Sequence, residues 1–228
     1  MKGGFTQDQI AVISETEQLL HEARYDPQFA EMMRARGYNE ESWAHGENLV
    51  NTLKSAGRAY EQAQSTKLGA ANTLKRQRDS LWTQSNLLSQ SCVTLFQGQT
   101  DYLNALGLHG ARRDGNGISR ISKPDKYSKM EQVVAWQRNL FEVAQTHAQI
   151  SPILATNGFP ADILAEGAAG VEALARADHA QEQAKTAAVQ RRTERDAAHK
   201  TLRMWLRCAQ RIAKAAKKDS AGGGLLGR

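Results

Sequence analysis

Basic side chains follow one face of a segment near the C-terminal end of the chain. Between Arg191 and Lys218, ten Lys or Arg residues stand against Glu194 and Asp196. Six of the cations recur every three or four residues, which places them on one face of an α-helix: Lys200, Arg203, Arg207, Arg211, Lys214 and Lys218. Such a stripe can bind nucleic-acid phosphates, an anionic membrane surface or an acidic protein, and it is also the ordinary solvated face of a bundle helix.

A second patterned stretch, from Asp79 to Leu108, carries only Asp79 and Asp101 as charges. Its apolar residues form one stripe, and we assign five of them as a candidate self-association surface: Leu81, Leu88, Leu95, Tyr102 and Leu106. The pattern predicts burial, either against the apolar face that carries Trp205 and Ile212 or at an interface between two copies of the chain.

Six histidines raise the question of a metal site. The chain has no Glu-x-x-His motif of the kind that di-iron bundles use, and the pairs Asp178-His179 and Asp196 with His199 are isolated. Nucleophile elbows, phosphate-cradling glycine loops and paired His/Cys arrangements are also missing. We therefore expect no metal, no cofactor and no enzymatic activity.

The helical elements that would position these residues can be read from capping signals. Ala, Gln, Leu, Arg, Lys and Glu dominate, and period-2 alternation is absent, so the sequence predicts an all-α fold. Thr6 with Gln9 predicts the start of a first helix, which restarts at Asp26-Pro27 and ends at Gly37. Residues 40–106 are predicted to form one long helix stopped by Gly107. Ser128 predicts a second capping box, with Glu131, before a second short helix.

An internal repeat relates the two halves of the chain. Shifting the sequence by 121 positions lays residues 37–63 on residues 158–184 without a gap, and ten of these 27 positions are identical. The repeat predicts two tandem helical hairpins, each a short helix followed by a very long helix, in an elongated antiparallel bundle with pseudo-two-fold symmetry. An alanine seam at coiled-coil spacing is expected to pack the long helices: Ala173, Ala177, Ala180, Ala184 and Ala187.

The repeat also predicts the domain organisation. We expect a first hairpin over residues 1–108, a linker over 109–127, a second hairpin over 128–219 and a disordered tail over 220–228. The linker is rich in Gly and basic residues, and it adds Arg112 and Arg113 to the candidate anionic-partner-binding residues, with help from Arg120, Lys123 and Lys126.

The composition of the chain indicates the cellular compartment in which we expect the protein. Only Cys92 and Cys208 carry thiols, no apolar stretch approaches the 18 residues of a membrane span, and the N-terminal residues lack the apolar core of a signal peptide. We expect a cytoplasmic protein without a transmembrane segment. The net charge of +6 is compatible with an anionic partner, although it is also an ordinary feature of a soluble surface.

The end of the second predicted long helix, Leu202-Arg203-Met204-Trp205-Leu206-Arg207, resembles the ends of long helices in uncharacterised bacterial tandem helical-hairpin proteins. The leucine-rich run Tyr102-Leu103-Asn104-Ala105-Leu106 looks like a shorter ending of the same kind. This resemblance implies a helical-bundle architecture. It implies nothing about activity, because those proteins have no assigned activity.

These patterns favour a non-enzymatic scaffold or interaction protein that associates with itself or with another protein. The alternative is a protein that binds nucleic acid or an anionic surface through the basic C-terminal helix.

Overall fold

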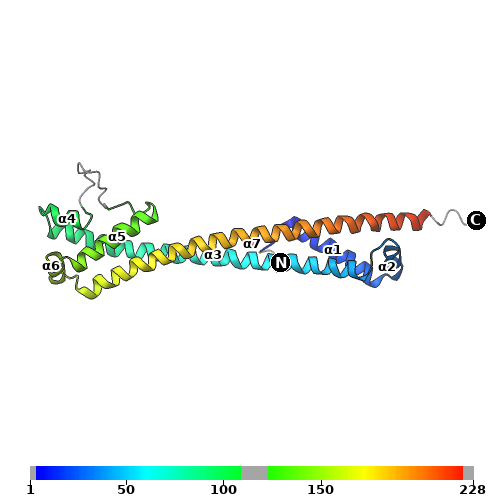
Figure 1. The fold of residues 1–228 in the computed structure, drawn as a ribbon, viewed down its shortest axis with the longest axis horizontal. Helices are drawn as coiled ribbons and strands as arrows, with labels where there is room; N and C mark the ends of the chain where they lie inside the picture. The colour runs from blue at the N-terminus through cyan, green and yellow to red at the C-terminus, as the bar shows by residue number, and fades with distance from the viewer. Residues whose placement is uncertain (1–3, 109–122, 223–228) are drawn as a thin grey trace, which may run out of the picture. The chain divides into compact units, whose positions relative to one another are not determined.

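The computed structural model describes residues 4–108 and 123–222, with side chains as far as Lys218, and these residues form an all-helical structure without a β-strand (Figure 1). The helices are α1 (Gln7–Tyr25), α2 (Pro27–Arg34), α3 (Glu40–Leu95), α4 (Thr100–Ala105), α5 (Met130–Thr146), α6 (Ile150–Thr156) and α7 (Ala161–Gly222). The predicted all-α class is thereby confirmed.

Local capping chemistry sets the starts of the N-terminal helices. Thr6 and Gln9 form the predicted capping box before α1, and the Asp26 carboxylate accepts hydrogen bonds from the backbone N–H groups of Gln28 and Phe29 to start α2. The predicted capping box at Ser128 is wrong. Lys129 occupies the N-cap of α5 without a side-chain hydrogen bond, and the Ser128 N–H bonds the Asp125 carbonyl in a preceding turn.

Two glycines in the left-handed region turn the chain into the long helices. Gly37 has φ +86° before α3, and Gly158 has φ +89° before α7. The following N–H reaches back across each turn, from Tyr38 to the Met33 carbonyl at 3.1 Å and from Phe159 to the Leu154 carbonyl at 2.9 Å. Both turns therefore have the hydrogen bond of a Schellman ending.

The first long helix is shorter than predicted. It ends at Leu95, and not at Leu106, because Gly98 adopts φ +85° and the Gln99 N–H bonds the Phe96 carbonyl, which breaks the helical ladder. The chain then forms the short α4.

The described residues divide into two compact units. The terminal unit contains the residues up to Lys67 together with those from Lys185 onwards, and the central unit is Leu68–Ala184. This division differs from the predicted domains, because each unit contains segments of both predicted hairpins. The physical reason is the antiparallel pairing of α3 with α7 inside each unit, which places the first part of one long helix beside the last part of the other.

The core of the terminal unit is built from α1, α2, the first part of α3 and the last part of α7. Gly46 leaves space for the indole of Trp205, since an added Cβ would lie 2.4 Å from its ring. Trp43 meets the same indole edge-on at 6.2 Å between ring centroids. The buried residues of this core include Phe29, Met33, Val50, Leu53, Leu202, Leu206, Ala209, Ala213 and Ala216.

The core of the central unit buries the stripe that was assigned to self-association. Leu81, Leu88 and Leu106 are at most 2% exposed and share one cluster with Trp136, Leu140, Val171 and Leu174. Leu95 and Tyr102 are half-buried and pack against that cluster, with the Tyr102 hydroxyl hydrogen-bonded to the Gln149 side chain.

This burial corrects both expectations for the stripe. Its apolar side chains are covered by the chain's own helices, so they do not form an exposed surface. Trp205 and Ile212, the expected packing partners, belong to the core of the terminal unit instead. Because α3 and α7 are antiparallel, the last part of α3 lies beside the first part of α7. A Cβ added at Gly170 of α7 would lie 3.0 Å from the Leu81 side chain of α3.

Buried positions recur 121 residues apart far beyond the identical stretch. The buried pairs include Val12 and Val133, Leu19 and Leu140, Phe29 and Ile150, Met33 and Leu154, Val50 and Val171, Leu53 and Leu174, and Leu81 and Leu202. The alanine seam is only partly correct, because Ala177, Ala184 and Ala188 are buried whereas Ala180 and Ala187 are exposed.

Candidate anionic-partner interface

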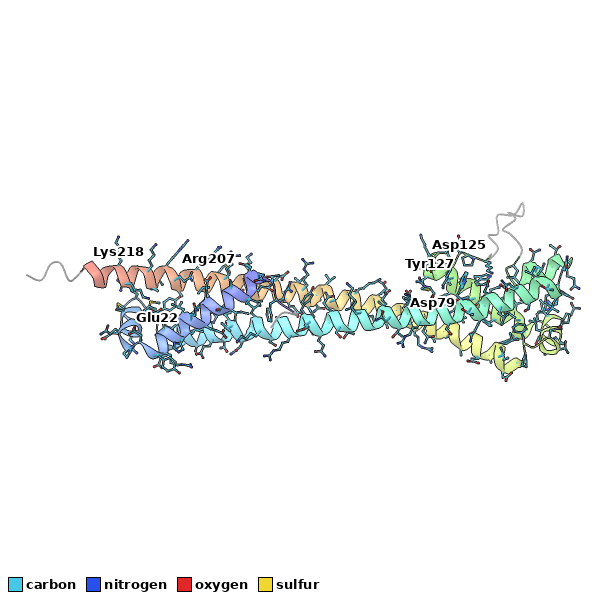
Figure 2. The ribbon with its side chains drawn as sticks, turned by 180° about the vertical axis from the view of Figure 1, so that it is seen from behind. Glu22, Asp79, Asp125, Tyr127, Arg207 and Lys218 are labelled. Atoms are coloured by element: carbon cyan, nitrogen blue, oxygen red, sulfur yellow. The ribbon has the colours of Figure 1, made fainter. Side chains whose placement is uncertain are left out.

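The basic stripe lies on the part of α7 that belongs to the terminal unit. Leu202, Leu206 and Ala209 on the opposite face of the same helix are buried in the core, and the packing of Trp205 on Gly46 fixes the rotation of α7 about its axis. Figure 2 shows Arg207 and Lys218 along the outer edge of this helix. The burial of one helix face therefore forces the basic face toward solvent.

Helix α1 runs parallel to this part of α7 and neutralises one edge of the stripe. Three polar pairs join the two helices, each between residues 195 apart in sequence: Asp8 with Arg203 at 3.1 Å, Glu15 with Gln210 at 3.0 Å, and Glu22 with Lys217. The pairs recur every seven residues on both helices, as expected for two helices packed in coiled-coil register. Arg203, a predicted site residue, is thus engaged within the chain.

The other five predicted cations on α7 are exposed: Lys200, Arg207, Arg211, Lys214 and Lys218. No described carboxylate forms an ion pair with any of them. At 100° per residue, these five side chains fall within an arc of about 60°, and they extend over about 27 Å of helix. The structure therefore presents a narrow line of uncompensated positive charge.

The linker residues do not all contribute to this line. Arg112, Arg113 and Arg120 lie outside the described residues. Lys123 donates hydrogen bonds to Asn86 and Ser89 of the central unit, and burial lowers the pKa of its ammonium group. Lys123 is therefore held by contacts within the central unit, to which the stripe does not belong.

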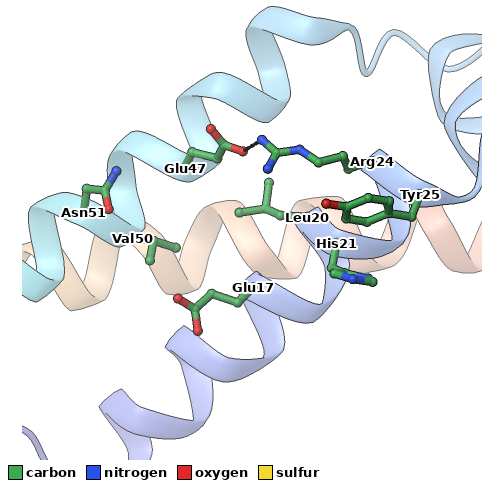
Figure 3. A pocket seen from close by; sticks show the side chains of 8 residues that line it. All are labelled: Glu17, Leu20, His21, Arg24, Tyr25, Glu47, Val50 and Asn51. Carbon is green, nitrogen blue, oxygen red and sulfur yellow. Dashed lines mark hydrogen bonds and ion pairs between the residues drawn. The ribbon is translucent and has the colours of Figure 1, made fainter. Parts of the chain in front are cut away.

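A hollow of about 360 Å³ lies between α1 and α3 in the terminal unit (Figure 3). Its charges are compensated internally, because Arg24 pairs with Glu47 at 2.6 Å and Glu17 pairs with Lys54 at 2.6 Å. A charged ligand would have to break these pairs, so this hollow is a weaker candidate than the stripe.

A second hollow, of about 350 Å³, lies in the central unit, and sequence reasoning did not identify it. The residues that line it come from α3, from the segment before α5 and from α7: Ala71, Leu74, Lys75, Arg78, Asp79, Lys126, Tyr127 and Gln181. Lys126 pairs with Asp79 at 2.8 Å, and this hydrogen bond holds the pKa of the carboxyl below its usual value. Only the i,i+3 spacing of Lys75 and Arg78 was visible in the sequence.

Within residues 4–108 and 123–222, no three His, Cys, Asp or Glu side chains are grouped to hold a metal ion. His199 lies 3.4 Å from the Asp8 carboxylate, which already binds Arg203. Across the same residues, no helix offers a run of apolar residues long enough to cross a bilayer.

Comparisons with known proteins identify no relative from which a function could be proposed, so the proposal rests on the geometry described above. No family model, no curated protein and no solved structure matches this chain.

Proposed function

We propose that this protein is a helical-bundle interaction protein that binds nucleic acid through the basic stripe of α7. The observation that carries the proposal is the line of five exposed cations without carboxylate partners, Lys200, Arg207, Arg211, Lys214 and Lys218. Cations spaced over about 27 Å of rigid helix suit a repeating row of phosphates. The buried core of the terminal unit holds this row straight.

The packing of α7 favours a polyanion over a bilayer. A helix that lies in a membrane interface must insert an apolar face among the acyl chains. On α7 that face is covered, because Leu202, Leu206 and Ala213 are at most 7% exposed within the core of the terminal unit. The charged face remains open to a partner, and a row of cations binds phosphate groups through charge.

The decisive experiment is a titration of labelled duplex DNA and single-stranded RNA, followed by fluorescence anisotropy between 50 and 200 mM salt. Five phosphate contacts predict a slope of log K against log salt of about −4.5 for duplex DNA. Affinity should then fall roughly 500-fold over this range. The triple variant R207Q/R211Q/K214Q should reduce the slope to about −2.

A matched control removes three cations outside the stripe. Arg58, Arg76 and Arg176 are exposed, and R58Q/R76Q/R176Q lowers the net charge equally. This variant should keep the wild-type slope, and circular dichroism should show that both variants retain their helicity. Equal losses in the two variants, or a wild-type slope near zero, would reject the stripe as the site. Binding to anionic vesicles without binding to nucleic acid would also reject the proposal.

The two-hairpin architecture belongs to the same proposal. We infer that the chain is a tandem duplication with pseudo-two-fold symmetry, supported by the buried positions 121 residues apart and by the matching turns at Gly37 and Gly158. The duplication has diverged in the last part of the long helices, where only α7 became strongly basic. Cysteines without a disulfide among the described residues, and a nucleic-acid partner, favour a cytoplasmic location.

A further inference from the structure

The hollow of the central unit contains more positive charge than its own carboxylate can neutralise. Lys75, Arg78 and Lys126 line it, against the single carboxylate of Asp79. Lys126 and Asp79 satisfy each other, so the charges of Lys75 and Arg78 are left over. Two like charges one helical turn apart repel each other, and an anion placed between them removes that cost.

The guanidinium group of Arg78 gives further evidence that the hollow suits an anion. Its Nε–H group is buried from solvent and has no hydrogen-bond partner among the described residues. A buried guanidinium N–H without a partner costs free energy, and a phosphate oxygen is the acceptor that fits the guanidinium best. Arg78 and Lys75 line the same hollow.

The rest of the lining suits a small organic phosphate. Leu74 and Ala71 form an apolar part of the wall, and the hollow of about 350 Å³ has the volume of a small-molecule site. Tyr127 is 79% exposed, and the Lys126 ammonium lies 5.7 Å from the centroid of its ring. Asp79 and Tyr127 both line the hollow, and Figure 2 labels them in the same part of the central unit.

We propose that this hollow binds the phosphate group of a small phosphate monoester. Lys75 and Arg78 contact the phosphate oxygens, and Gln181 offers an amide donor from α7. The Lys126–Asp79 pair anchors the segment before α5 to α3, and it thereby keeps Tyr127 at the mouth of the hollow. This site lies in the central unit and does not depend on the basic stripe of the terminal unit.

The test is isothermal titration of the full-length protein with inorganic phosphate, AMP and adenosine at constant ionic strength. Phosphate and AMP should bind, and adenosine should not, because it lacks the anion. R78Q and K75Q should each weaken phosphate binding by about tenfold or more, as expected from the loss of a charge-assisted hydrogen bond.

The matched control is R76Q, which removes an exposed cation between the two lining residues on the same helix. It should leave the affinity for phosphate unchanged, as should R207Q/R211Q/K214Q in the terminal unit. Thermal melts should show that the variants stay folded. The proposal is overturned if adenosine binds as well as AMP, if R76Q weakens binding as much as R78Q, or if phosphate shows no saturable binding below about 10 mM.

Discussion

Arg203 on α7 and Asp8 on α1 lie 195 residues apart in sequence, yet the arginine Nη1 and the carboxylate Oδ2 are 3.1 Å apart. Gln210 with Glu15 and Lys217 with Glu22 repeat the same separation one and two heptads further along. A slip of α1 along α7 by one residue would break all three pairs together. The three pairs therefore fix the register of α1 against α7, and they decide which cations remain available to a partner.

The first prediction concerns the energy of this pair. Both side chains are about half exposed, so a double-mutant cycle with D8N and R203Q should give a favourable coupling of only about 0.5 kcal/mol, measured by urea unfolding. The coupling should shrink as salt is raised from 0.05 to 0.5 M, because exposed charges are screened. The control cycle, D8N with R207Q, should show no coupling, since Arg207 has no described ion-pair partner. Equal coupling in the two cycles would contradict the register.

The second prediction separates two glycines inside helices of the central unit. A Cβ at Gly167 would lie 2.0 Å from the ring of Phe141, which is buried and cannot retreat, whereas nothing lies within 4 Å of a Cβ at Gly69. G167A should therefore destabilise the protein by about 1–3 kcal/mol through overpacking. G69A should stabilise it by about 1 kcal/mol, because alanine is the better helix former. Urea unfolding checks both, and effects of the same sign would refute this packing.

The third prediction concerns the two thiols. Burial raises the pKa of Cys92 to about 12, while Cys208 is exposed. Because the thiolate is the reactive form, one thiol should react quickly with Ellman's reagent at pH 8 in the native protein, and two should react in denaturant. C208S should abolish the fast phase, whereas C92S should leave it unchanged. Rapid reaction of both native thiols would show that the central core is open.

The same chemistry gives a reporter for the proposed function. Cys208 follows Arg207 directly, so a bound polyanion should slow its alkylation at low salt. Alkylation at an unchanged rate with DNA bound would place the DNA elsewhere on the protein. This measurement complements the anisotropy titration because it locates the ligand on the helix.

Much of the local structure could be predicted because its causes are local. The Thr6 capping box, the Asp26-Pro27 restart and the turn at Gly37 each depend on residues within about one helical turn. The errors arose where competing local signals had similar strength. Gly98 follows the end of α3 at Leu95, eleven residues before the predicted end at Leu106, and Ser128 joined a turn with Asp125 in place of a cap.

The chain's sequence by itself determined the all-α class, the 121-residue repeat and the basic face of α7, because helix propensity and the 3.6-residue period require no partner. Only the tertiary structure decided which helix covers each apolar stripe. The repeat makes the stripes of Leu81 and Leu202 alike, so periodicity cannot distinguish their possible partners. Helix packing buried Leu81 with Val171, paired Arg203 of α7 with Asp8 of the parallel helix α1, and brought Lys75, Arg78 and Lys126 around one hollow. These contacts join residues far apart in sequence. Their energies depend on how the side chains of neighbouring helices fit together, which local sequence patterns do not specify.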